Sequence, residues 1–180
     1  MRIIAPCKST FITLTATAIA NGSQQHQIQQ AYAISDDDPC HELNLKDANR
    51  IVKENCHVGT PSNYWDVNGM GDWSIQGFAQ PFSNNVGEKV DFKVKTDSDD
   101  WEIDIFRIGY YKGAGARKIT TLRPKDFNIK QPECLFEEST WFLDCGNWEV
   151  SASWPIPADA VSGLYLARPQ RLDYDADFDV

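Results

Sequence analysis

The fold is decided by residues 89–118, which read KVDFKVKTDSDDWEIDIFRIGYYKGAGARK. Apolar and charged residues alternate along 90–94, the period-two pattern of a strand with one buried face. After a polar turn over 96–100, a second alternation runs through 101–105. A Gly-Ala-Gly turn follows, and the chain then doubles back into a third apolar segment. These features predict three strands that pair in chain order as an antiparallel meander.

The rest of the chain shows the same kind of pattern. Residues 42–53 fit neither the helical nor the strand period, so either a short helix or an extended arm is expected there. Further short strands are predicted over 74–79, 81–85, 134–136, 141–143, 148–154 and 162–167. Seven or eight short strands with turns between them predict an all-β fold, an antiparallel β-sandwich of immunoglobulin-like or jelly-roll-like type. Because the chain ends in an acidic tail instead of a closing apolar strand, we expect the sandwich to be incomplete at the C-terminus.

Composition narrows the class of partner. The chain has 180 residues, of which 42% are hydrophobic and 12% aromatic, which is typical of a globular protein with one core. Its formal net charge is -9 and its pI is about 4.7. Nucleic acids and anionic membrane surfaces require a positive face, so neither is expected as a partner.

The N-terminus resembles a targeting segment. Basic residues flank an uncharged stretch over 9–19, and a small-x-small pattern at 18–20 is typical of a cleavage site. The stretch is too short and too rich in threonine for a membrane span. A secreted protein is therefore predicted, with a disordered N-terminus as the alternative. The predicted division is a signal peptide over 1–20, a flexible leader over 21–38, a β-sandwich over 39–167 and an acidic tail over 168–180.

Five cysteines are present, and Cys7 lies in the predicted signal peptide. The other four form an even set, which in an oxidising compartment predicts disulfides. Four cysteines allow three connectivities, and the sequence does not choose among them. The most economical pairing joins Cys134 to Cys145 and Cys40 to Cys56. In the chain-entropy treatment, the loop of about 12 residues between Cys134 and Cys145 would contribute roughly 3 kcal/mol.

Two stretches contain residue types that can bind a metal ion. Cys40-His41 and Cys56-His57 hint at zinc, but the chain has no CxxC spacing. Carboxylates recur at every second position of the tail, as in the first half of a calcium loop, at Asp173, Asp175 and Asp177. The tail lacks the glycine and the closing glutamate of such a loop, so a solvated tail is the competing interpretation. No metal site is predicted outright.

The sequence contains no recognisable catalytic motif. Its histidines, His26, His41 and His57, all lie near the N-terminus, and neither a phosphate loop nor a nucleophile elbow is present. No catalytic residue is therefore predicted. Trp65 and Trp73, in a glycine-rich region, are candidates for stacking on a sugar ring, although such rings more often close the edge of a core.

A series of short motifs resembles the N-terminal part of N,N-dimethylformamidase large-subunit-like proteins. The series spans about residues 49–167 in order and includes IVKEN (51–55), GTPS (59–62), SIQGFA (74–79), IDIFRIGYY (103–111), GAGARK (113–118), DCGNW (144–148), VSASW (150–154) and ADAVSGLY (158–165). In such proteins the corresponding segment looks like a β-sandwich that precedes a larger α/β domain with amidohydrolase chemistry. The resemblance also supports the pairing of Cys134 with Cys145.

The resemblance sets the functional expectation. True dimethylformamidases hold iron through Tyr and Glu side chains of the downstream domain, so no ligand role is carried onto Tyr110 or Tyr111. The expectation is a non-catalytic N-terminal accessory domain of a secreted amidohydrolase, without a cofactor of its own. Its partner would be a downstream catalytic domain or a partner subunit. The alternative is an extracellular module that binds a carbohydrate or another surface.

Overall fold

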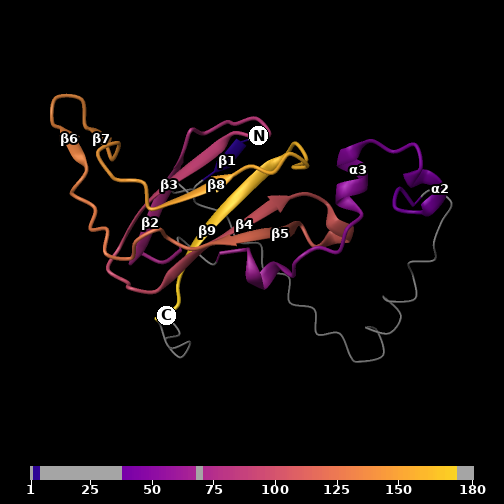
Figure 1. Ribbon diagram of the computed structural model, residues 1–180, viewed down its shortest axis with the longest axis horizontal. Helices are drawn as coiled ribbons and strands as arrows, with labels where there is room; N and C mark the ends of the chain where they lie inside the picture. Colours follow the sequence, from indigo (N-terminus) through magenta and orange to yellow (C-terminus); the bar gives the residue numbers. More distant parts are fainter. Residues whose placement is uncertain (1, 5–37, 68–70, 174–180) are drawn as a thin grey trace, which may run out of the picture.

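Two β-sheets share one apolar core (Figure 1). The computed structural model describes residues 2–4, 38–67 and 71–173. Its strands are β1 (Arg2–Ile4), β2 (Ile75–Gln80), β3 (Lys89–Thr96), β4 (Trp101–Ile108), β5 (Ala116–Leu122), β6 (Leu135–Glu137), β7 (Phe142–Asp144), β8 (Ala152–Pro155) and β9 (Leu164–Arg171). Its helical segments are α2 (Glu42–Leu45), α3 (Arg50–Asn55), and the single turns η1 (Ser62–Tyr64) and η2 (Tyr111–Gly113).

The strands are arranged in three sheets. One sheet has the order β1-β9-β4-β5, the second has the order β2-β3-β8, and β6 and β7 form a separate hairpin. Neighbouring strands in the described part of the chain run antiparallel, except for the parallel pair β1–β9. The all-β class and the sandwich are therefore confirmed. The finer assignment to an immunoglobulin-like or jelly-roll-like type stays a prediction.

The predicted meander is wrong in one connection. β4 and β5 form the expected hairpin, but β3 lies in the other sheet and pairs with β2 and β8. The polar turn over 96–100 therefore crosses between the sheets. Alternation along each strand shows which face is buried, but not which neighbour the strand pairs with. The apolar faces of β3 and β4 contribute to the same core from opposite sides.

The core lies between the two sheets. β3 contributes alternate residues from Val90 to Val94, and β4 contributes alternate residues from Trp101 to Ile105. Trp154 of β8 and Tyr165 of β9 complete it, with their ring centroids 5.5 Å apart. Consecutive residues of β4 are buried from Ile103 to Arg107, so the strand is covered on both faces there.

Other boundaries shift from those predicted. Residues 81–85 form bends, one bridge residue and irregular backbone instead of a strand, and the strand predicted over 148–154 shortens to β8. β9 continues through Arg171, beyond the predicted end of the sandwich at 167. In the predicted signal segment, the structure places β1 beside β9. The predicted leader and most of the acidic tail lie outside the described residues, so these divisions stay predictions.

Two short helices, α2 and α3, precede β2 in the chain. Asn49 caps α3, because its side-chain oxygen accepts hydrogen bonds from the backbone N–H groups of Ile51 and Val52, both at 3.0 Å. A disulfide joins Cys40 to Cys56 at the end of α3. Figure 1 shows α2 and α3 at one end of the molecule and the β6–β7 hairpin at the other. In the described part of the chain, no helix has the length and apolar character needed to cross a membrane.

Candidate functional site

The turn between β4 and β5 has an unusual backbone. Tyr111 and Lys112 have φ angles of 40° and 55°, in the left-handed region that side chains with a Cβ seldom adopt. Such strain persists only where the surroundings enforce it, and it concentrates at functional sites. The turn therefore marks the part of the described chain where a site is best sought.

A buried carboxylate lies behind this turn. Glu54 of α3 is 7% exposed. Its Oε1 atom accepts a hydrogen bond from the Tyr111 hydroxyl at 2.9 Å and two from Arg117, through Nε at 2.9 Å and Nη2 at 2.6 Å. These contacts join α3 to the strained turn and to β5, which lie more than 50 residues away in the sequence.

A buried arginine completes the cluster. Arg107 of β4 is 3% exposed, and its Nη1 donates to the Tyr111 hydroxyl at 3.0 Å. Its Nη2 donates to the backbone carbonyl of Ser162 at 2.8 Å, and its Nε donates to that of Val161 at 3.4 Å. Arg107 thus holds the loop before β9 against the turn after β4. We call Glu54, Arg107, Tyr111 and Arg117 the Glu–Tyr–Arg cluster.

The protonation states in the cluster follow from its contacts. Burial raises the pKa of Glu54, but the hydrogen bonds from Arg117 and Tyr111 and the two positive charges outweigh burial, so the pKa lies below its ordinary value. Burial raises the pKa of the Tyr111 hydroxyl. At neutral pH the cluster therefore holds an ionised carboxylate and a neutral phenol. Neither group is poised to exchange a proton near pH 7, as general acid–base catalysis requires.

The lowered pKa of Glu54 predicts a pH dependence of stability. The ordinary value of 4.5 applies to the unfolded chain, so the stabilisation is fully present above that pH. It is lost as the pH falls through the lower folded-state pKa. We expect Glu54→Gln to lower the free energy of unfolding by about 1–3 kcal/mol at pH 7. At pH 3 the difference in the free energy of unfolding between the variant and the wild type should be smaller, because part of the stabilisation by ionised Glu54 is already lost there. Urea denaturation of both proteins at the two pH values measures this difference. An equal loss at both would contradict the assignment.

The cluster contains the two side-chain types that hold iron in dimethylformamidases, which allows a test of fit. The carboxylate of Glu54 and the hydroxyl of Tyr111 do lie within hydrogen-bonding distance. However, the guanidinium groups of Arg107 and Arg117 share these same oxygens. Two fixed positive charges beside both oxygens would repel a metal cation. Glu54 and Tyr111 therefore do not fit an iron centre. Their hydrogen bonds to arginine are instead typical of a buried network that stabilises the fold.

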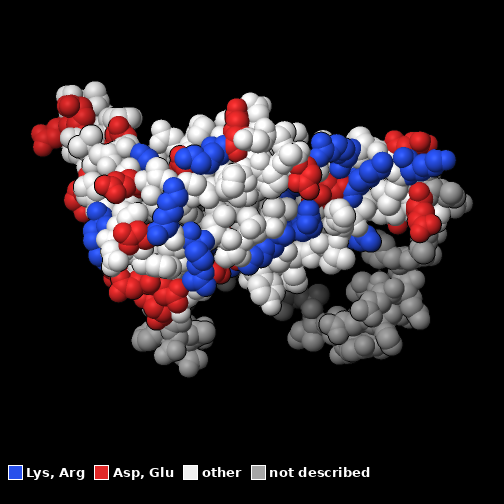
Figure 2. Space-filling view, in the orientation of Figure 1, with Lys and Arg blue, Asp and Glu red and all other residues white. Residues whose placement is uncertain are grey.

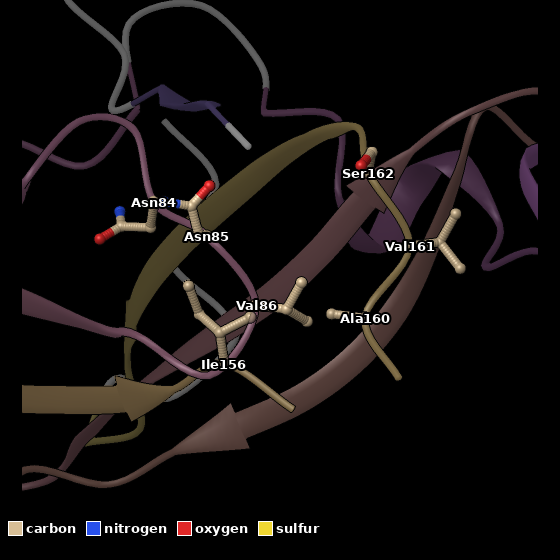
Figure 3. Close-up of a pocket in the computed structure, with 7 residues that line it drawn as sticks. All are labelled: Asn84, Asn85, Val86, Ile156, Ala160, Val161 and Ser162. Atoms are coloured by element: carbon tan, nitrogen blue, oxygen red, sulfur yellow. The ribbon is translucent and has the colours of Figure 1, made fainter. Parts of the chain in front are cut away.

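A small pocket lies near the cluster, beside the loop that Arg107 holds (Figure 3). It encloses about 80 Å³ and is lined by Asn84, Asn85, Val86, Ile156, Ala160, Val161 and Ser162. Figure 3 shows the apolar ends of Val86, Ile156 and Ala160 turned towards one another. Asn84 is 4% exposed and its Oδ1 has no hydrogen-bond partner, but its amide points away from these three residues. The pocket is therefore small, and polar and apolar residues line it in similar proportion.

The two tryptophans proposed for sugar stacking have different surroundings. The indole N–H of Trp65 donates to the backbone carbonyl of Thr60 at 3.1 Å, and its ring packs over Gly115. Trp65 thus takes part in holding the strained turn. Trp73 is 64% exposed. Stacking of a sugar on Trp65 and Trp73 stays a prediction.

The structure pairs all four cysteines outside the predicted signal peptide and describes one of the three aspartates predicted as calcium ligands. Disulfides join Cys40 to Cys56 and Cys134 to Cys145, which is the pairing with the shortest loops. The side chain of Asp173 pairs with Arg171, which lowers the pKa of its carboxyl. The other two predicted calcium ligands, Asp175 and Asp177, lie outside the described residues. Within the described ranges, no group of three or more His, Cys, Asp or Glu side chains is arranged to hold a metal ion.

Sequence reasoning missed the Glu–Tyr–Arg cluster, although one signal was present. The core face of β4 is occupied at 101, 103 and 105, and Arg107 is the next residue in that alternation. A charge at a core position must be paired, because an isolated buried charge is very costly. The sequence does not reveal the partner, because α3 meets β4 only in the folded chain.

Comparison with known proteins gives one match. Residues 102–178 match the family described as N,N-dimethylformamidase beta subunit-like, C-terminal. The matched region begins in β4 and includes the strained turn, the β6–β7 hairpin and β9. The predicted resemblance to dimethylformamidase-like proteins is therefore confirmed over residues 102–178, where the description reads C-terminal and the prediction had placed the resemblance in the N-terminal part of such proteins. Comparison with curated proteins and with solved structures gives no match.

Proposed function

Because residues 102–178 belong to the N,N-dimethylformamidase beta subunit-like family, we propose that this chain supplies a non-catalytic β-sandwich to an amidohydrolase of that type. In this proposal the sandwich is an accessory part, and the hydrolytic chemistry resides in another domain or subunit. The family description itself names a subunit, which supports a role within an assembly.

The observation that carries the proposal is the state of the Glu–Tyr–Arg cluster. The matched region contributes Arg107, Tyr111 and Arg117, and the carboxylate that they bind comes from α3. The Tyr111 hydroxyl and Oε1 of Glu54 each accept a hydrogen bond from a guanidinium group, and Oε2 of Glu54 lies 3.9 Å from Nε2 of His57. These contacts join α3, β4, the strained turn and β5, which supports a structural role for the cluster.

The compartment and the cofactor belong to the same proposal. Two disulfides are typical of proteins that fold in an oxidising compartment, which supports an extracellular location. Iron, if the assembly uses it as dimethylformamidases do, would be held by the catalytic part and not by this chain.

Titration with ferric iron tests the proposal at the cluster. A tyrosinate–iron centre would absorb visible light through charge transfer from the phenolate. We expect the purified chain to develop no such band, and Tyr111→Phe to behave like the wild type. A band that appears with one equivalent of iron and disappears in Tyr111→Phe would overturn the proposal. Tyr110→Phe, an exposed neighbour in the same turn, is the matched control.

A further inference from the structure

The β6–β7 hairpin stands apart from the sandwich. It spans residues 134–145, and Figure 1 shows it projecting from the end opposite α2 and α3. The disulfide between Cys134 and Cys145 closes its base, with the two Cα atoms 4.4 Å apart. Below the disulfide, the indole N–H of Trp148 donates to the Pro132 carbonyl at 3.0 Å. The base is thus tied to the sandwich, while the two strands extend away from it.

The hairpin exposes an unusual amount of apolar surface. All six residues of its strands are exposed, and two strands of three residues each bury too little to be stable alone. Five large apolar side chains have exposed fractions from 53% to 83%: Leu135, Phe136, Trp141, Phe142 and Leu143. The register places Phe136 and Leu143 on one face of the hairpin and Leu135 and Phe142 on the other. Exposed apolar surface of this extent marks a site of interaction.

The aromatic part of this surface is already arranged for contact. The rings of Phe136 and Trp141 meet edge to face with centroids 6.0 Å apart. Trp141 also has a φ of 56°, a conformation that bulky residues rarely adopt and that costs free energy. Trp141 ends the turn between β6 and β7, a position where hairpins often place a left-handed residue, and this backbone holds its ring 83% exposed. Rigid aromatic anchors are the residues that dominate the energy of protein interfaces.

The charge of the hairpin identifies the kind of partner. It carries Glu137, Glu138 and Asp144 and has no Lys or Arg between Cys134 and Cys145. In Figure 2 the projecting end shows carboxylates and uncharged residues, whereas Lys and Arg gather over the body of the visible face. Carboxylates beside the apolar residues are repelled by an anionic lipid surface. They complement a protein surface with a basic rim.

We propose that the β6–β7 hairpin is a docking element that inserts Trp141 and Phe136, whose rings are in contact, into an apolar pocket of a protein partner. Lys and Arg side chains rim that pocket and face Glu137 and Glu138. The proposal rests on the geometry and charge of the hairpin and does not depend on the proposed function.

Site-specific photo-crosslinking identifies the partner. A benzophenone amino acid is placed at position 141 or, as the matched control, at position 58, where Val58 is also 83% exposed. The full chain is expressed in its native cells, irradiated, and the adducts are identified by mass spectrometry. We expect one protein joined at position 141 and absent at 58, crosslinked beside apolar residues and Lys or Arg. No adduct specific to 141 would overturn the proposal.

Binding of the purified partner then tests the chemistry. Trp141→Asn removes the ring and suits the left-handed backbone, so the fold should be retained. We expect it to raise the Kd at least about tenfold, and added salt to weaken wild-type binding. Val58→Asn should leave the Kd unchanged. An unchanged Kd for Trp141→Asn, self-association through the hairpin, or preferential binding to phosphatidylserine vesicles would each overturn the proposal.

Discussion

Replacement of Arg107 by methionine is expected to lower the free energy of unfolding by about 3–5 kcal/mol. The side chain is 3% exposed and donates to the Tyr111 hydroxyl and to the carbonyls of Val161 and Ser162. Methionine fills much of the same volume but donates no hydrogen bond, so these acceptors lose their buried partner. Urea denaturation followed by tryptophan fluorescence measures the loss.

Arg123→Met is the matched control for this change. Its side chain is 53% exposed and pairs with Asp100 and Glu102 at the surface. Exposed ion pairs contribute little, so we expect a loss of at most about 1 kcal/mol. If the two variants lost the same stability, the cluster around Arg107 would not be the fastening that its contacts indicate.

Replacement of Gly115 by alanine should destabilise the chain by about 2–5 kcal/mol. Gly115 has a φ of 83°, and a Cβ there would lie 2.6 Å from the ring of Trp65. Backbone strain and overpacking therefore act together. Gly113, in the same turn, has a φ of 91°, and a Cβ added there would meet nothing within 4 Å. Gly113→Ala should therefore lower the free energy of unfolding only through backbone strain, by about 1–2 kcal/mol.

A double variant separates the two contributions at Gly115. Trp65→Ala removes the ring that the new methyl group would meet, while the backbone term remains. In the Trp65→Ala background, we therefore expect Gly115→Ala to cost about the same as Gly113→Ala. If Gly115→Ala lost as much stability in that background as in the wild type, the ring of Trp65 would not be the cause of the overpacking.

The alternation of apolar residues was sufficient to locate most of the strands. It works for β3, β4 and β9 because each has a face on the shared core. It did not reveal that β3 and β4 belong to different sheets, because a buried face looks the same from either side of a sandwich. The sequence also predicted a strand over 81–85, where the structure has bends, one bridge residue and irregular backbone.

The candidate site was harder to predict from the sequence than the fold was. Its four members come from α3, β4, the strained turn and β5, and only the folded chain brings them together. The positive φ angles of Tyr111 and Lys112 have no signal in the residue types, since neither is a glycine. The family resemblance, by contrast, was recognisable because its motifs between residues 103 and 165 follow one another in order within the region that the comparison matches; its motifs between 51 and 79 lie outside that region.

The central proposal is that the chain is a non-catalytic part of a dimethylformamidase-like assembly and does not hydrolyse amides itself. The most direct measurement is release of dimethylamine from N,N-dimethylformamide by the purified 180-residue chain, with and without ferric iron. Glu54→Gln is measured in parallel. We predict no release above the blank from either protein. Release by the wild type that is lost in Glu54→Gln would contradict the account, because it would make the buried carboxylate a catalytic group.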